Sequence, residues 1–280
     1  TNSALSAISA KRLKVPIFHM EAGNRCFDQN VPEEINRKIV DHISDINLPY
    51  TEHSRRYLIS EGFRKEHIFV TGSPMCEVLS EYKDQIERND ILNELRLEPK
   101  KYILVSAHRE ENVDNEKNFD SLINALNAVA DEYRLPIIYS MHPRSQKRIE
   151  ERKAVLNPLI KSLKPFGYFE YNKLQMNSFC VLSDSGTLSE ESSILNFPAV
   201  LIRTSTERPE VLDKGTIVIG GIDKYSIIQS IELTVSAGFK ENIVADDYKD
   251  NYVSLKVVKL IQSYTKVINK LVWDKEDSYE

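Results

Sequence analysis

Two carboxylates near the start of the chain, Glu21 and Glu33, lie 12 residues apart and are candidates for proton transfer. Glu21 follows the apolar run 15–18, which predicts a strand, and it precedes Gly23. Glu33 follows Pro32 in the first turn of a predicted helix. One loop therefore separates the two carboxylates, and both could face the same crevice. Taken singly, Glu21 is an ordinary strand-end residue, and Glu33 is a carboxylate that complements the helix dipole.

A histidine and an arginine, His108 and Arg109, follow the predicted strand 102–106. A histidine at a strand end beside an arginine is suited to contact a phosphate or to act as a general acid. A lone histidine is as often structural, so both interpretations stay open. His142 also follows a predicted strand, 136–140, and we expect it to be structural.

Small residues follow the buried-type strand 180–183, in the run Asp184-Ser185-Gly186-Thr187 that opens a predicted helix. Small side chains let the backbone approach a ligand, and free N–H groups at a helix start bind phosphate. The alternative is an ordinary helix cap. Glu190 and Glu191 follow, and a carboxylate would repel a phosphate but can accept both hydroxyls of a ribose. The combination indicates a nucleotide, with its diphosphate at the loop and its ribose further along.

Two arginines, Arg203 and Arg208, follow the predicted strand 199–202. A guanidinium can pair with a phosphate through two hydrogen bonds, so Arg208 is a candidate diphosphate contact. The alternative is an ion pair in a surface loop, which we expect for Arg203.

Strand and helix signals alternate along the whole chain, which predicts parallel sheets covered on both faces. The candidate residues above follow strands, and ligands of such sheets bind beyond the carboxyl ends of the strands. The charged stretch 77–101 separates two doubly wound domains, 1–90 and 91–252. The predicted strands are 15–19, 45–50, 67–72, 102–106, 136–140, 180–183, 199–202 and 216–219. The later predicted helices include 116–133, 145–156, 188–195, 224–237 and 253–273.

The composition excludes several classes of protein. The net charge is −5 and the pI about 5.8, so a basic nucleic-acid-binding face is not expected. The longest apolar runs are far shorter than the roughly 20 residues of a membrane span. Three scattered cysteines argue against a disulfide scaffold and a CxxC zinc site, and indicate the cytosol. The chain begins with Thr1 rather than Met, and 90 residues is small for a doubly wound domain, so we expect an N-terminal part to be missing.

Five motifs resemble the non-hydrolysing UDP-N-acetylglucosamine 2-epimerase family, fall in family order and span most of the chain. They are His19-x-Glu-Ala-Gly23, Pro32-Glu-Glu-x-Asn-Arg37, His108-Arg-x-Glu-Asn112, Asp184-Ser-Gly186 with Glu190-Glu191, and Thr206-Glu-Arg-Pro-Glu210. The resemblance implies two Rossmann-like domains of the glycosyltransferase-B type with the active site in the cleft between them. It also implies that the last segment, 253–280, crosses back to the first domain, and that the protein is a homodimer.

The resemblance implies a role for each candidate. Glu21 and Glu33 correspond to catalytic carboxylates, and Thr1 to the residue just after a third one. The remaining counterparts are the catalytic His108, the diphosphate contacts Ser185, Gly186 and Arg208, the ribose ligand Glu191 and the uracil contact Tyr171. Thr187 stands where a second glycine is common.

The implied reaction needs no nicotinamide or other cofactor, which agrees with the absence of a GxGxxG motif. A carboxylate removes the C2 proton as UDP leaves, giving a glycal to which UDP returns. The loop 24–28 and the run 31–50 resemble the branch that forms UDP-N-acetyl-L-fucosamine for capsule or O-antigen synthesis. The alternative substrate is UDP-N-acetylglucosamine, giving UDP-N-acetylmannosamine. A glycosyltransferase of the same architecture, a hydrolysing relative and an inactive nucleotide-sugar sensor are the alternative functions.

Overall fold

The structure is a computed structural model that describes residues 2–29, 31–236 and 244–275. The chain divides into two compact units: unit 1 is residues 1–78 with 246–280, and unit 2 is residues 79–245. Among the described residues, every pair of neighbouring strands is parallel. The prediction of an α/β fold with parallel sheets is therefore confirmed.

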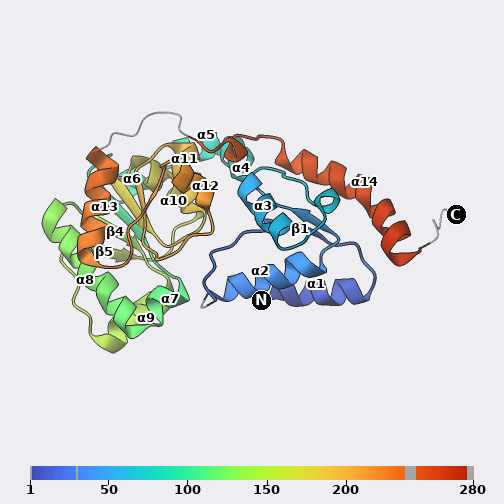
Figure 1. Cartoon of the computed structure of the whole chain (residues 1–280). Helices are drawn as coiled ribbons and strands as arrows, with labels where there is room; N and C mark the ends of the chain where they lie inside the picture. Colours follow the sequence, from blue (N-terminus) through green and yellow to red (C-terminus); the bar gives the residue numbers. More distant parts are fainter. Residues whose placement is uncertain (1, 30, 237–243, 276–280) are drawn as a thin grey trace. The chain divides into compact units, whose positions relative to one another are not determined.

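Unit 1 contains a short parallel pair, β1 (Phe18–Met20) and β2 (Ile46–Leu48). The helices α1 (Asn2–Arg12) and α2 (Pro32–Ile43) pack against each other, as Figure 1 shows. The next helix is α3 (Glu52–Ser60), and it begins where the Thr51 hydroxyl accepts the Ser54 N–H at 3.2 Å. Thr51 therefore caps α3, as its sequence predicts.

The predicted strand 67–72 is wrong. Residues 65–67 form a 3-10 helix, and within the described residues the following segment makes one isolated parallel bridge, Asn47 to Ile68. Thr71 still donates its N–H to the Pro49 carbonyl at 3.0 Å. Pro49 has no N–H to donate in return, so the ladder of hydrogen bonds cannot continue past it.

The helix α14 (Val253–Trp273) belongs to unit 1 and begins and ends where the sequence predicts. A 3-10 helix, Asp246–Tyr248, precedes it. Its residues Val253, Val257 and Ile268 form a buried cluster with Ile46 and Leu48 of β2. Apolar burial therefore holds this distant segment of sequence against the β1–β2 sheet.

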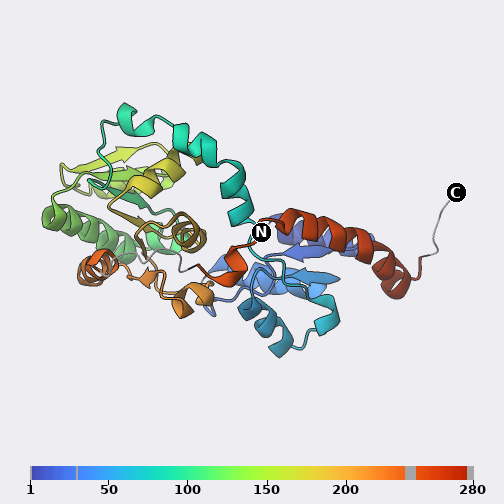
Figure 2. The same ribbon diagram turned by 90° about the horizontal axis from the view of Figure 1, so that it is seen from above.

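Unit 2 is built on a six-stranded parallel sheet in the order β5-β4-β3-β6-β7-β8. The order reverses between β3 and β6, which is the switch point of a doubly wound sheet. The helices α8 (Glu116–Tyr133) and α13 (Lys224–Ser236) lie side by side and bury apolar residues against the sheet, as Figures 1 and 2 show. The strands are β3 (Ile103–Ser106), β4 (Ile137–Ser140), β5 (Ile160–Leu163), β6 (Cys180–Ser183), β7 (Ala199–Leu201) and β8 (Val218–Ile219).

The remaining helices are short and mostly follow strands. They are α4 (Met75–Glu81), α5 (Lys83–Arg88), α6 (Ile91–Glu94), α7 (Glu110–Val113), α9 (Pro143–Arg152), α10 (Tyr168–Asn177), α11 (Leu188–Leu195) and α12 (Pro209–Asp213). The sequence does not predict β5, an edge strand with exposed Lys161 and Ser162, or α10, which buries the polar Asn172 and Gln175. Among the described residues, no helix is long and apolar enough to span a membrane.

Candidate active site

Unit 2 brings its candidate residues together where β3, β6 and β7 end. These strands are neighbours, and Ser106, the last residue of β3, pairs in register with Ser183, the last residue of β6. The loops after the three strands carry His108, the 184–187 run and Arg208. They therefore lie at the switch point, where ligands of doubly wound sheets bind.

Asp184 connects these loops. Its carboxylate is wholly buried and accepts the backbone N–H groups of His108 and Arg109, each at 3.0 Å, and the Asn112 side-chain amide at 3.1 Å. The same Asn112 amide donates to the Ile202 carbonyl at 3.1 Å, which ties in the loop after β7. One buried carboxylate thus satisfies donors from the loop after β3, which holds that loop in place.

His108 presents its ring at the surface of this arrangement, because its side chain is 48% exposed. Its Nδ1 lies 3.3 Å from Asp184 Oδ1. His142 is exposed, and its Nδ1 accepts the Arg144 N–H at the start of α9. His142 is a helix cap, which confirms the structural interpretation.

A network of four charged residues lies beside Gly186: Arg109, Glu111, Arg203 and Glu207. Glu207 is 3% exposed and pairs with Arg203 at 2.8 Å and with Arg109 at 3.5 Å. Glu111 lies 3.8 Å from both arginines. The prediction that Arg203 lies in a surface ion pair is wrong, because its side chain is buried and the residue is 2% exposed. The loop after β7 folds inward, and the carboxylates of Glu111 and Glu207 neutralise the buried guanidinium.

The loop before α11 is compact. The hydroxyls of Ser185 and Thr187 hydrogen bond to each other at 3.0 Å, and the Ser185 N–H donates to Ser183 Oγ. A Cβ on Gly186 would lie 2.4 Å from Glu207 Oε1. A side chain at position 186 would therefore displace the Glu207 carboxylate, which is paired with Arg203 and Arg109.

The adjacent Glu190 and Glu191 have different partners. Glu190 Oε2 pairs with Arg208 Nη2 at 3.3 Å, and both side chains are buried. Glu191 accepts the Gln175 side-chain amide at 2.7 Å and also hydrogen bonds to Thr187. Burial raises the pKa of Glu191 above its ordinary value. Among the described residues, Glu190 thus pairs with an arginine, whereas the donors to Glu191 given above, Gln175 and Thr187, are neutral.

Tyr171 lies on α10 beside the same strand ends. Its hydroxyl interacts with the hydroxyls of Ser106 and Ser183, and burial raises its pKa. The phenol is therefore held at the register pair that joins β3 to β6.

Unit 1 carries the two candidate carboxylates on either side of one loop. Glu21 directly follows β1 in a left-handed backbone conformation, with φ 62°, which is rare for residues other than glycine and common at functional sites. Asn24 donates its side-chain amide to Glu21 Oε1 at 3.0 Å. Glu33 is exposed in the first turn of α2. Thr1, the predicted neighbour of a third carboxylate, lies outside the described residues.

Buried charges hold the loop that follows Glu21. The Arg25 guanidinium is wholly buried and contacts Glu61 and Asp41, with each shortest distance 2.7 Å. Asp41 also accepts the Gly23 N–H and lies 2.8 Å from His19 Nδ1. Gly23 has φ 76°, and a Cβ there would lie 2.4 Å from the Ser54 carbonyl oxygen, so this position requires glycine.

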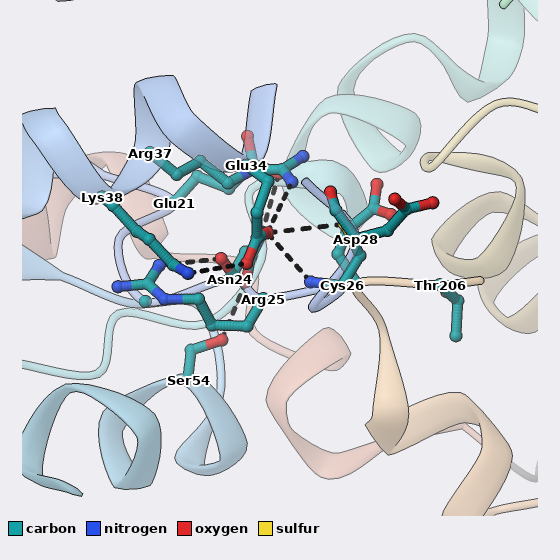
Figure 3. A network of polar contacts seen from close by, with 12 residues as sticks. Glu21, Asn24, Arg25, Cys26, Asp28, Glu34, Arg37, Lys38, Ser54 and Thr206 are labelled. Carbon is teal, nitrogen blue, oxygen red and sulfur yellow. Dashed lines mark hydrogen bonds and ion pairs between the residues drawn. The ribbon is translucent and has the colours of Figure 1, made fainter. Parts of the chain in front are cut away.

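Glu34 anchors the far end of the same loop. Its buried Oε2 accepts the Cys26 N–H at 3.0 Å, and the side chains of Arg37 and Lys38 lie within 3.8 Å of the carboxylate. Figure 3 shows the contacts of Glu34 with Cys26 and with the side chains of Arg37 and Lys38. The sequence motifs alone did not single out Arg25, Glu34 or Asp41. Their spacing could have indicated Glu34 and Asp41, because residues seven apart lie on the same face of a helix such as α2.

In the part of the chain that the structure describes, no group of three or more His, Cys, Asp or Glu side chains could hold a metal ion. The polar groups gathered in unit 2 include hydroxyls, an imidazole, guanidinium groups and carboxylates. These are groups that bind phosphate and ribose oxygens.

The chain matches known proteins over most of its length. Residues 1–262 match the family model described as UDP-N-acetylglucosamine 2-epimerase. The UDP-N-acetylglucosamine 2-epimerase of Methanocaldococcus jannaschii is 35% identical over 245 residues, which cover 84% of this chain and 67% of that relative. The chain therefore spans about two thirds of that relative's length.

Two solved structures are similar in fold. UDP-N-acetylglucosamine 2-epimerase from Rickettsia bellii has a TM-score of 0.89 at 46% identity, covering 98% of this chain and 74% of that one. The M. jannaschii UDP-GlcNAc 2-epimerase in complex with UDP-GlcNAc and UDP has a TM-score of 0.86 at 33% identity, covering 94% and 74%. These similarities agree with two Rossmann-like units of the glycosyltransferase-B type.

Proposed function

The chain belongs to the UDP-N-acetylglucosamine 2-epimerase family, and on that premise we propose that it inverts C2 of a UDP-2-acetamido sugar by eliminating and re-adding UDP. The observation that carries the proposal is the gathering of phosphate- and ribose-binding groups at the ends of β3, β6 and β7. A relative that is 33% identical has been solved in complex with UDP-GlcNAc and UDP, which supports a nucleotide-sugar ligand.

We assign the binding of UDP to the domain spanning 91–252. Ser185, Gly186, Thr187 and Arg208 contact the diphosphate, Glu191 the ribose and Tyr171 the uracil end. The pairing of Glu190 with Arg208 supports this division, because among the described residues Glu191 accepts hydrogen bonds from the neutral side chains of Gln175 and Thr187. Charge growing on the departing diphosphate is stabilised by His108, by Arg208 and by backbone N–H groups. Each such donor contributes about 3 kcal/mol to lowering the barrier.

We assign proton transfer at C2 to the carboxylates of the domain spanning 1–90. The C2 hydrogen is not next to a carbonyl, so its simple removal as a proton is too costly for a carboxylate. Elimination solves this problem: the base takes the proton, the C–H electron pair forms the C1–C2 double bond, and the C1–O pair leaves with UDP. Inversion needs a proton donor on the opposite face, which accounts for the pair Glu21 and Glu33.

Two candidate substrates are consistent with this proposal. The names of the relatives support UDP-N-acetylglucosamine, with UDP-N-acetylmannosamine as its epimer. The loop 24–28 and the run 31–50 support the 6-deoxy talose epimer of UDP-N-acetyl-L-fucosamine, because both resemble the branch that forms that sugar.

The test is NMR analysis of products formed in D2O from a panel of UDP-2-acetamido sugars. We expect one substrate to yield its C2 epimer, with deuterium at C2 of both epimers. Epimerisation without deuterium would refute elimination, and release of free sugar and UDP would identify a hydrolase. Transfer of the sugar to an added acceptor would identify a glycosyltransferase, and UDP binding without turnover would identify a sensor.

A further inference from the structure

The contact between Asp184 and His108 does more than hold a loop. Asp184 Oδ2 accepts the N–H groups of His108 and Arg109 and the Asn112 amide. Asp184 Oδ1 lies 3.3 Å from Nδ1 of the His108 ring, and the His108 N–H is shared with it at 3.2 Å. Oδ2 of this buried carboxylate thus takes most of the loop donors, and Oδ1 is the oxygen that faces the imidazole.

The partners of Asp184 determine which ring nitrogen of His108 carries a proton. N–H groups converge on this carboxylate, so it acts as an acceptor. Asp184 Oδ1 lies 3.3 Å from Nδ1, and its negative charge favours the neutral tautomer with a hydrogen on Nδ1 over the tautomer with a lone pair there. The other ring nitrogen, Nε2, is therefore the one that gains or loses a proton. This choice of nitrogen does not depend on the identity of the ligand.

We propose that Asp184 is a positioning residue that holds His108 in its Nδ1–H tautomer, so that Nε2 exchanges the proton with the substrate. The second half of this statement rests on the proposed function. There, Nε2–H of the imidazolium gives its proton to a β-phosphate oxygen as the C1–O bond breaks. The ring is left as the neutral Nδ1–H tautomer, and it takes the proton back when UDP re-adds.

The Asp184→Asn variant tests the tautomer sharply. The carbonyl oxygen of the new amide would replace Oδ2, because most of the loop donors converge there. Its NH2 group would then replace Oδ1 and would donate to Nδ1, which forces the neutral ring into the Nε2–H tautomer. The measurement is ¹⁵N NMR of the histidine rings in labelled protein, at a pH where the His108 ring is neutral. The His108→Gln variant assigns the signals.

We expect Nδ1–H in the unmodified protein and Nε2–H in Asp184→Asn. The matched control is Asn112→Ala, which removes a donor from Oδ2 and leaves the atom facing Nδ1 unchanged, so the tautomer should stay Nδ1–H. A neutral Nε2–H ring in the unmodified protein would overturn the proposal, even if Asp184→Asn did not fold. The same tautomer in both proteins would also overturn it.

Kinetics test the second half. We expect Asp184→Asn to lower kcat by about 10²- to 10⁴-fold, as loss of a proton-transfer group does, with the Kd for UDP within a few-fold of the unmodified value. A reversed tautomer with unchanged kcat would refute the positioning role while leaving the epimerase proposal intact. If the protein does not epimerise any substrate, the tautomer measurement still decides the first half.

Discussion

Glu34 is wholly buried against Cys26, whereas Glu33, the preceding residue of α2, is exposed. Successive residues of a helix are rotated by about 100°, so the side chains of Glu33 and Glu34 leave α2 in different directions. The motif that contains both therefore combines a carboxylate that anchors the loop after Glu21 with one that is available to a ligand.

The exposure of Glu33 and the burial of Glu34 predict that Glu33→Gln mainly affects C2 exchange, whereas Glu34→Gln mainly affects stability. Glu33→Gln should leave the free energy of unfolding within about 0.5 kcal/mol, because the side chain is exposed. It should lower the rate of C2 exchange about 10²-fold or more, because it removes a proton-transfer group. Urea unfolding and deuterium exchange measured by NMR check both effects.

Glu34→Gln should lower the free energy of unfolding by about 1 to 3 kcal/mol, because buried donors lose a charged acceptor. Equal destabilisation by the two variants would contradict the assignment, as would full C2 exchange in Glu33→Gln.

The buried Arg25 should be a main source of stability in unit 1. Arg25→Ala leaves Asp41 buried without its guanidinium partner, so we expect a loss of about 3 to 5 kcal/mol in urea unfolding. The control is Arg88→Ala, whose ion pair with Asp84 has side chains 83% and 75% exposed. That change should cost less than about 1 kcal/mol. Similar losses in the two variants would show that the buried network contributes little.

Glu191 should give a pH-dependent stability effect. Burial raises its pKa in the folded protein above the ordinary value of 4.5, so the unfolded chain ionises this group at lower pH. The ionised form therefore disfavours folding near neutral pH, and this cost disappears as the pH falls below the ordinary value. Glu191→Gln should raise the Tm at neutral pH, with a difference that shrinks toward pH 4.5.

The same variant should bind UDP about 10- to 100-fold more weakly, because a charged acceptor of the ribose hydroxyls is lost. Calorimetry with UDP checks the affinity. A Tm gain that is constant with pH, or unchanged UDP affinity, would contradict the assignment.

Gly186→Ala should disturb the charged network. Its Cβ would displace Glu207, which is held by Arg203 and Arg109, so we expect a loss of about 1 to 3 kcal/mol and weaker UDP binding. Gly215→Ala is the control, because its Cβ would meet no atom within 4 Å. Its positive φ should cost about 1 to 2 kcal/mol without altering UDP affinity. An unchanged affinity in Gly186→Ala would refute close approach of the diphosphate to this loop.

Local patterns were sufficient to predict α11 and α14 at their observed bounds, and to predict the strands β3, β4 and β6 closely. The spacing of apolar residues and the residues that cap a helix lie within the element or next to it, so they predict its position without information from distant parts of the chain. The strand predicted at 67–72 failed because its hydrogen bonds depend on Pro49, about 20 residues away in the sequence. The edge strand β5 was not predicted, because its two central residues, Lys161 and Ser162, are polar and exposed.

The sequence by itself determined the alternating α/β plan and the motifs that carry His108, Glu191 and Arg208. Only the tertiary structure decided which charged residues in those motifs are buried and paired, as Arg203 and Asp184 are. The physical reason is that burial depends on loops that follow different strands packing together, as the pairs of Asp184 with His108 and of Glu207 with Arg109 show. A residue's neighbours in sequence therefore do not by themselves show whether its charge will be buried.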